Sequence, residues 1–414
     1  MAGDETRKGI QVQNFWLAVG LSIFASLVFY FSVKPTQQHF DYTARIASAF
    51  LDGHLGLRSS PPSWLNEMVP RDGNYYSVFP LGAVLSLIPV ALLQKVGAIQ
   101  GFPGHVLAAM IAGLCAYFFF RLSGLEGKSF SRRILLALFP IFGTWTWCNL
   151  GFAGAWHIAL GFALLGEVGA LYFVLVRACP LIGGFFFALA FGNRTEVILT
   201  LPIYLYYLWF PRGGDADPAT FNNALRQFRE KLPALVQFSI IPVALAFFTA
   251  VYNFERFQSI FEFGYNRIPN VLREPWYQHG LFSLRAIPWN MYKMLFEGFS
   301  DIPVFPFIRP NAFGCSIFLS SPFLFLLFRE GGKYKIAAWT GIGLLAFVLW
   351  CHGNPGGWQF SYRYAIILLP WMFLLLVGNG PAKRSAIEVS LFIISVAINA
   401  IATYQFLWTN EIHP

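Results

Sequence analysis

The chain has 414 residues, of which 56% are hydrophobic and only 12% are charged. That is about half the charged fraction of an ordinary soluble protein, so the composition excludes a soluble globular domain and indicates that most of the chain lies in lipid. The net charge of +9 does not indicate a nucleic-acid partner, because no basic run is longer than a pair. We attribute the charge to cytoplasmic loops that orient a membrane protein.

The apolar segments predict an all-α, polytopic membrane protein with about eleven transmembrane helices. The first follows a charged start, and no small-residue cleavage site comes after it, so we expect a retained anchor rather than a removed signal peptide. The segments lie at 15–33, 104–121, 134–150, 157–176, 180–192, 196–210, 234–252, 313–328, 336–351, 364–379 and 387–408. The pair at 180–192 and 196–210 is short for a bilayer crossing.

The segment 79–94 decides the predicted topology. It is short and contains Pro80 and Pro89, so we interpret it as an interfacial helix rather than a span. This choice places the N-terminus and the short basic loops, which hold just over half of the 29 Lys and Arg residues, in the cytoplasm. The longest of these loops, 211–232, is predicted to form a polar, partly amphipathic helix.

The predicted outer face carries most of the non-membrane sequence. Within a single integral membrane domain, 1–414, the first outer loop covers 34–103 and includes interfacial helices, and the second covers 253–312. A protein with its long loops on one face is expected to work at that face. We therefore expect a multi-pass protein of the cell inner (plasma) membrane with a site that faces the periplasm or exterior.

The first outer loop begins with a polar segment, "HFDYTARIASAFLDGHLGL" (39–57). Asp41 lies only a few residues past the first span and therefore stays near the membrane surface. It can cap a helix and pair with Arg45 four residues later, or it can act at a site. Asp52, Tyr75 and Tyr76 are further candidates in this loop, which also contains Glu67 and Asp72.

Four other candidates lie at the ends of apolar segments. Arg194 and Glu196, in "FGNRTEVILTLP", are predicted at membrane depth, where ionisable groups either pair with each other or serve a function. Arg363 starts a span after the turn "CHGNPGGWQFSY", where it can also be a snorkelling arginine in an aromatic belt. His157 opens a span from the outer side, a position at which a lone histidine is more often a helix-end hydrogen bonder.

The second outer loop mixes aromatic residues with Arg256, Arg267, Arg273 and His279. Aromatic faces stack on sugars and guanidinium groups clamp phosphates, so the loop suits an anionic head group or a sugar. It equally suits a loop that lies on the membrane interface. Arg267 is our candidate from this loop.

The order and chemistry of these elements resemble the GT-C membrane glycosyltransferases, which use polyprenyl-phosphate-linked sugars. That group includes the protein O-mannosyltransferases and the aminoarabinose transferases of lipid A. The resemblance covers about 15–380 and rests on these segments: "FDYTARIASAFLDGHLGL", "GNYYSVFPLGAVLSLIPVALL", "FGNRTEVILTLP", "YNFERFQSIFEFGYN" and "GGWQFSYRYAIILLP". It implies a GT-C-like fold, interfacial helices in the first outer loop, and an active-site carboxylate at Asp41. Tyr42 stands where many members have a second acidic residue, and no large soluble C-terminal domain is visible.

The resemblance implies transfer of a sugar from a polyprenyl-phosphate donor to a lipid, glycan or protein acceptor. Asp41 would accept the proton of the acceptor hydroxyl. Arg194 and Arg363, followed by His157 and Arg267, would stabilise the departing lipid phosphate. No cofactor is required, although paired carboxylates could hold a divalent metal.

Two alternatives remain open. One is a lipid-linked sugar flippase or transporter that uses Arg194 and Glu196 to pass an anionic substrate, although no inverted internal repeat is visible. The other is an oligosaccharide polymerase or ligase, supported by the arginine-rich second outer loop. Replacing Asp41 by Asn separates transfer from transport, because a flippase should be indifferent to this change.

Overall fold

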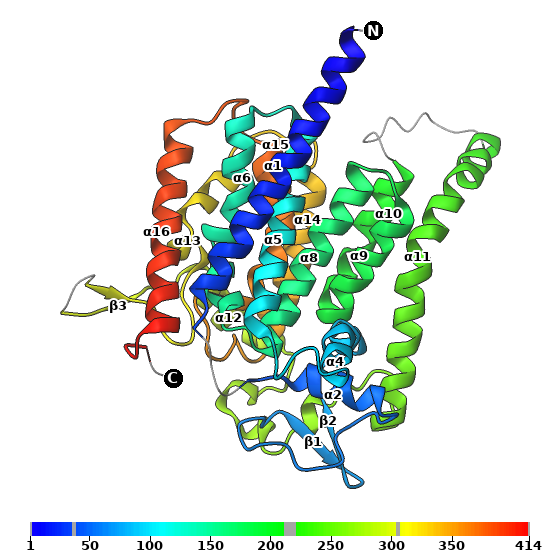
Figure 1. Ribbon diagram of the computed structural model, residues 1–414, viewed down its shortest axis with the longest axis vertical. Coiled ribbons are helices and arrows are strands. Elements are labelled where there is room, and N and C mark those ends of the chain that lie inside the picture. Colours follow the sequence, from blue (N-terminus) through cyan, green and yellow to red (C-terminus); the bar gives the residue numbers. More distant parts are fainter. Residues whose placement is uncertain (1, 35–38, 211–220, 304–306, 413–414) are drawn as a thin grey trace.

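The computed structural model describes residues 2–34, 39–210, 221–303 and 307–412 (Figure 1). The α-helices of the described chain are α1 (Ala2–Ser32), α2 (Tyr42–Leu51), α3 (Leu81–Leu85), α4 (Ile88–Lys95), α5 (Gly104–Leu122), α6 (Phe130–Phe142), α7 (Thr146–Gly151), α8 (Ala155–Leu175), α9 (Pro180–Asn193), α10 (Leu201–Trp209), α11 (Phe221–Phe257), α12 (Ile287–Leu295), α13 (Ile317–Ser320), α14 (Lys335–Cys351), α15 (Leu369–Gly378) and α16 (Ala386–Trp408).

Short 3-10 helices and two strand pairs complete these elements. The 3-10 helices are η1 (Ser123–Glu126), η2 (Thr195–Thr200), η3 (Tyr265–Arg267), η4 (Val271–Arg273), η5 (Pro275–Tyr277), η6 (Leu284–Ala286), η7 (Pro322–Phe328) and η8 (Arg363–Leu368). The strands are β1 (Met68–Arg71) with β2 (Asn74–Ser77), and β3 (Ser300–Asp301) with β4 (Ile308–Arg309), both pairs antiparallel. These short hairpins depart from the all-α prediction, but the chain is mostly helical.

Among the residues described, five helical segments are long and apolar enough to cross a membrane: Asn14–Ser32, Gly104–Glu126, Ala155–Leu175, Arg229–Phe257 and Ala386–Trp408. The third of these is 83% buried in the protein, whereas the first and fourth are only 17% and 11% buried. The peripheral helix α11 exposes Phe247 and Phe248. Exposed apolar surface of this extent is stable in lipid and not in water, so the helices give the chain the character of a membrane protein.

Several predicted spans are built from two short helices rather than one. The predicted segment 134–150 is divided between α6 and α7, and 196–210 between η2 and α10. The predicted segments 313–328 and 364–379 are likewise divided, into α13 with η7 and η8 with α15. Prolines stand at the first or second position of α10, η7 and α15. A proline has no N–H to donate and restricts the residue before it, so the helix type changes at these points.

The predicted inner-loop helix 211–232 is not a separate element. Residues 211–220 lie outside the described residues, and from Phe221 the helix continues through the apolar segment to Phe257 as α11, 37 residues long. Pro233 and Pro242 stand inside it. The sequence pattern changes from polar to apolar along this helix, but nothing at that boundary ends it.

The first outer loop contains a hairpin and three short helices. Asp72 and Gly73 form the turn between β1 and β2 with positive φ angles of 51° and 74°, the conformation that two-residue hairpin turns require. The predicted interfacial segment 79–94 forms two helices, α3 and α4, with Pro80 directly before the first and Pro89 near the start of the second. At Gly82, α3 approaches α9 so closely that an added Cβ would lie 2.4 Å from the Cα of Gly192.

The two long predicted outer loops fold against each other at one end of the helix bundle. Figure 1 shows α2, α4, β1 and β2 gathered at the lower end, opposite the end at which α1 begins. The side chain of Arg256, at the end of α11, is 1% exposed and donates to the carbonyl of Ser77 in β2. Arg71 in β1 donates in turn to the carbonyl of Arg256 at 2.6 Å. The site described below lies where these loops meet the ends of α8, α9 and α14.

Candidate functional site

Arg194 and Arg363 come together on one aromatic ring. The guanidinium carbon of Arg194 lies 4.8 Å from the ring centre of Tyr364, and that of Arg363 lies 5.0 Å from the same centre. Cation–π attraction to a shared ring offsets part of the repulsion between the two like charges. We call Arg194, Arg363 and Tyr364 the arginine–tyrosine cluster. It joins two segments that are 170 positions apart in the sequence, the end of α9 and the start of η8.

Arg194 has a full carboxylate partner. It follows the last residue of α9 in an extended conformation, and the chain then turns into η2. Its Nε and Nη2 both donate to Oε1 of Glu196, at 2.9 and 2.6 Å. The Arg–Glu pair was one of the two alternatives that the sequence left open, and it largely neutralises the charge of Arg194.

Arg363 has no such partner. Its side chain is 8% exposed, and no carboxylate of the described residues lies within ion-pair distance of its guanidinium. Nη1 donates to the carbonyl of Trp358 at 3.5 Å, Nη2 donates to the hydroxyl of Tyr364 at 3.2 Å, and the buried Nε makes no hydrogen bond. A buried cation with an unused donor is unfavourable unless an anion joins it.

His157 is buried at the start of α8, beside this cation. It is 6% exposed, its ring lies 4.9 Å from that of Phe152, and neither ring nitrogen has a hydrogen-bond partner in the described structure. The positive charge of Arg363 interacts electrostatically with the imidazole of His157. The expected helix-end hydrogen bond of His157 is therefore not formed, and the ring is available to a ligand.

Glu67 is a carboxylate on which the charge of Arg363 acts. Its Oε2 accepts a hydrogen bond of 2.8 Å from the indole nitrogen of Trp156, the residue before His157. Burial raises the pKa of Glu67, while the Trp156 hydrogen bond and the charge of Arg363 act in the opposite direction. From the sequence, Glu67 was only one of several acidic residues in the first outer loop.

Tyr42 connects Asp41 with Glu67: it follows Asp41 in the sequence, and its hydroxyl accepts from the Glu67 N–H at 3.4 Å. Burial raises the pKa of the Tyr42 hydroxyl, and the charges of Glu67 and Asp41 both add to this effect. That hydroxyl donates to Oδ1 of Asn66 at 3.2 Å. Asp41 Oδ1 accepts from Nε of Arg45 at 2.8 Å, and Oδ2 makes no hydrogen bond within the described residues. Asp41 precedes α2, but its side chain does not cap the helix as the sequence suggested.

The remaining predicted candidates lie outside this assembly. Asp52 pairs with Lys95 at 2.8 Å on the surface, where the two side chains are 61% and 52% exposed. The ring of Tyr76 packs against Phe257, and Tyr75 pairs through its backbone with Leu57.

Arg267 also points elsewhere. Its Nη2 donates to the carbonyl of Phe257 at 3.3 Å, and its Nε lies 4.0 Å from Glu262. The structure therefore does not bring Arg267 to the arginine–tyrosine cluster.

The sequence did not single out Tyr364 of the cluster or three residues that border it, Trp156, Tyr265 and His352. The hydroxyl of Tyr277 donates to that of Tyr265 at 3.2 Å, and the His352 ring centre lies 5.7 Å from that of Tyr364. Burial lowers the pKa of His352, and the charges of Arg194 and Arg363 lower it further. Tyr364 follows Arg363 directly, so adjacency was the one sequence signal that pointed to any of them.

The described residues contain no group of three or more His, Cys, Asp or Glu side chains that could hold a metal ion. A groove of about 410 Å³ lies between α10 and α11, lined by Leu205, Trp209, Leu235, Val236 and Ser239. It has no titratable group and lies away from the cluster. No family model, no curated protein and no solved structure matches the chain.

Proposed function

We propose that the chain is a glycosyltransferase that moves a sugar from a polyprenyl-phosphate donor to an acceptor hydroxyl at the outer face of the membrane. In this proposal Asp41 is the general base, and Arg363 and Arg194 hold the phosphate of the donor. His157 and Glu67 complete the wall of the site.

The observation that carries the proposal is the uncompensated charge of Arg363. Its guanidinium is buried, has an unused Nε donor and shares the ring of Tyr364 with a second guanidinium. Water cannot supply a counter-charge to such a group, but a phosphate can, because its oxygens accept several charge-assisted hydrogen bonds at once. A carboxylate–histidine border on the same side provides groups that can accept protons.

The chemistry divides between these groups. Asp41 Oδ2 accepts the proton of the acceptor hydroxyl as its oxygen attacks the anomeric carbon. The bond between that carbon and the phosphate oxygen breaks, and the electron pair leaves with the polyprenyl phosphate. The charge that develops on this phosphate is stabilised by Arg363 and, once Glu196 shares its hydrogen bonds, by Arg194. Glu67 is half-buried and its pKa is raised, so it is the second candidate for the base.

The proposal includes the orientation that the basic loops predict. About eleven crossings, with the N-terminus in the cytoplasm, would place the end that carries α2 and β1 outside the cell membrane. Figure 1 shows α2, α4, β1 and β2 at that end, and the arginine–tyrosine cluster lies at the end of α9 and the start of η8. A donor whose lipid stays in the bilayer could then reach the cluster from the side.

The test is sugar transfer by the purified protein in detergent, from a panel of radiolabelled polyprenyl-phosphate sugars. Asp41→Asn is expected to lower turnover by about 10²–10⁴-fold while donor binding is kept, because only proton removal is lost. Arg363→Met is expected to lower turnover by about 10²–10³-fold and to weaken donor binding as well. Asp52→Asn and Arg267→Met are the matched controls, and they should retain activity.

Equal turnover by wild type and Asp41→Asn would remove Asp41 from the mechanism and transfer its role to Glu67, which Glu67→Gln then tests. If no donor is turned over but the lipid binds saturably and is moved across vesicles by Asp41→Asn, the transferase proposal fails in favour of transport. Retention of full binding and turnover by Arg363→Met would contradict the assignment of the phosphate site.

A further inference from the structure

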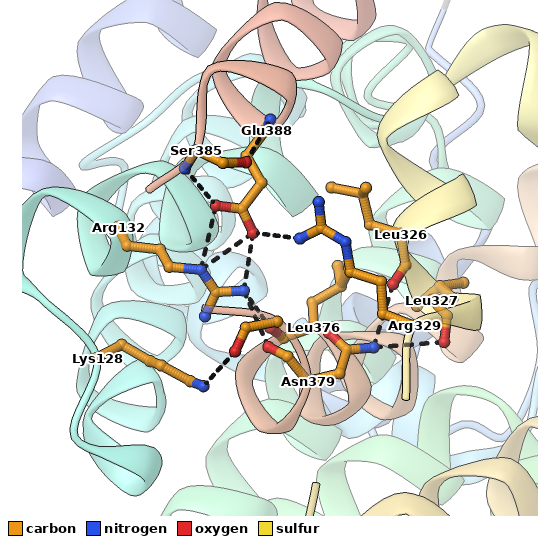
Figure 2. Close-up of polar contacts among 10 residues, drawn as sticks. Lys128, Arg132, Leu326, Leu327, Arg329, Leu376, Asn379, Ser385 and Glu388 are labelled. Atoms are coloured by element: carbon orange, nitrogen blue, oxygen red, sulfur yellow. Dashed lines mark hydrogen bonds and ion pairs between the residues drawn. The ribbon is translucent and has the colours of Figure 1, made fainter. Parts of the chain in front are cut away.

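A second cationic cluster lies where α6 begins, at the end of the bundle opposite α2 and β1 (Figure 1), and Figure 2 shows its Lys128 and Arg132 side chains. We call Lys128, Ser129 and Arg132 the α6 N-terminal cluster. The loop between α15 and α16 covers it, since Ser129 N–H donates to the carbonyl of Ala382 at 2.8 Å and Lys128 Nζ donates to that of Gly380 at 3.1 Å. The proposed transferase site does not use these residues.

The carboxylate beside this cluster is fully engaged. Glu388 is 0% exposed and accepts from Arg132 Nη2 at 3.0 Å and from Arg329 Nη1 at 2.8 Å. Its other oxygen accepts the Ser385 N–H at 3.0 Å and thereby closes a capping box at the start of α16. Glu388 therefore makes no direct hydrogen bond to Lys128 or to Nη1 of Arg132.

Two polar atoms of the cluster are buried without a partner. Arg132 is 1% exposed, and its Nη1 makes no hydrogen bond, although its Nη2 donates to the carbonyls of Leu376 and Asn379. In Figure 2 this free nitrogen points toward the side of Lys128. Ser129 directly precedes α6, yet its Oγ accepts no N–H of the first turn and is also unpartnered.

The electrostatics of the cluster favour an anion. The N-terminus of a helix carries a partial positive charge and free N–H groups, so basic side chains there are unfavourable by themselves. Burial lowers the pKa of Lys128, and the charge of Arg132 lowers it further, while Glu126 and Glu388 oppose this. Arg133 is not part of the cluster, because its guanidinium donates to the side chains of Ser123 and Asn14.

Gly380 lets the loop between α15 and α16 lie directly against the arginines. Its φ is +72°, and an added Cβ would lie 2.9 Å from Arg329 Nη1 and 3.0 Å from Arg132 Nη2. The cluster reaches the surface at Lys128 and Ser129, which are half-buried. Arg329 beside it has a side chain that is 27% exposed. A ligand therefore meets the cluster first at Lys128, beside Arg329.

We propose that the α6 N-terminal cluster binds a phosphate group, supplied either by a phospholipid headgroup in the adjacent leaflet or by free phosphate. The phosphate would accept from Lys128 Nζ, Arg132 Nη1, Ser129 Oγ and the first N–H groups of α6. This site is independent of the sugar-transfer site and stands whether or not the chain is a transferase.

The test uses the full-length protein in nanodiscs, with thermal unfolding as the readout. In the free-phosphate arm, nanodiscs of phosphatidylcholine are titrated with inorganic phosphate against chloride of equal ionic strength. In the lipid arm, phosphatidylglycerol is added to the nanodiscs without phosphate, and native mass spectrometry counts the lipids retained. Lys128→Met is the test variant because it removes one donor and leaves the Arg132–Glu388 pair intact.

Lys335→Met is the matched control, since Lys335 is an exposed lysine that follows the loop in which Gly332 packs against Gly378 at the same end. A saturable rise of the unfolding temperature in either arm, with an apparent Kd at least about tenfold weaker in Lys128→Met and unchanged in Lys335→Met, supports the proposal and identifies the source. No response of the wild type in either arm overturns it. Equal responses of Lys128→Met and wild type overturn it as well.

Discussion

Replacing Glu388 by Gln is expected to destabilise the protein severely although Glu388 lies far from the proposed transferase site. The substitution keeps the volume and shape of the side chain but removes the only negative charge that Arg132 contacts among the residues that the structure describes. Because Arg132 is 1% exposed, water cannot take over its hydration, and a buried cation is left without compensation (Figure 2).

The magnitude follows from this burial. Removing one partner of a buried ion pair costs about 3–5 kcal/mol, most of it from the charge that remains. Arg329 is 27% exposed and adds less, because solvent screens its side chain. Arg132 keeps its bonds to the carbonyls of Leu376 and Asn379, so we expect a loss near the lower end of that range, about 3 kcal/mol.

The assay is reversible unfolding in mixed micelles of detergent and dodecyl sulfate, followed by circular dichroism. The control is Glu262→Gln, because Glu262 faces Arg267 at 4.0 Å with both side chains partly exposed and should contribute less than about 1 kcal/mol. The double variant Arg132→Met with Glu388→Leu should recover much of the loss, since an apolar pair leaves no charge buried. A loss below about 1 kcal/mol for Glu388→Gln would refute the reasoning.

Two further predictions concern packing and protonation. Gly341→Ala should lower the free energy of unfolding by about 1–3 kcal/mol, because the added Cβ would lie 2.6 Å from the buried ring of Trp371. Gly343→Ala in the same helix is the control: its Cβ meets nothing within 4 Å, so it should be neutral or stabilising by up to about 1 kcal/mol. Equal effects of the two substitutions in thermal melts would contradict the packing. Burial raises the pKa of Glu67, so the folded protein holds that proton more tightly than the unfolded chain does, and stability should fall as the pH rises from about 4.3 through the raised pKa. Glu67→Gln keeps an acceptor for Trp156 and should remove this pH dependence; parallel pH profiles for the two proteins would count against the raised pKa.

The apolar segments predicted the helices well, because twenty apolar residues in lipid can satisfy their backbone only as a helix. Where the prediction failed, the cause was local. The sequence did not reveal that Phe221–Phe257 continues as one helix, or that the first outer loop contains a β-hairpin at Asp72 and Gly73. The start of that helix and the hairpin are both polar, and hydropathy carries little information about polar segments.

The site was predicted residue by residue but not as an assembly. Arg194, Glu196 and Arg363 were identified because charged groups at the ends of apolar segments are costly and therefore informative. Arg267 and Asp52 were chosen by the same chemistry, yet each faces a different partner. Type and spacing of residues cannot distinguish such cases, because the direction of a loop side chain depends on contacts distant in the sequence.

By itself, the sequence determined that the chain is a mostly helical membrane protein with its long polar loops grouped at one face, since hydropathy and charge act on each segment separately. Only the tertiary structure decided which charges are compensated. Arg132 and Arg194 each meet a glutamate, whereas Arg363 meets the ring of Tyr364 and, within the described parts of the chain, no carboxylate. The physical reason is that the energy of a buried charge depends on neighbours that the fold brings from distant segments, and that energy identifies the groups that need a ligand.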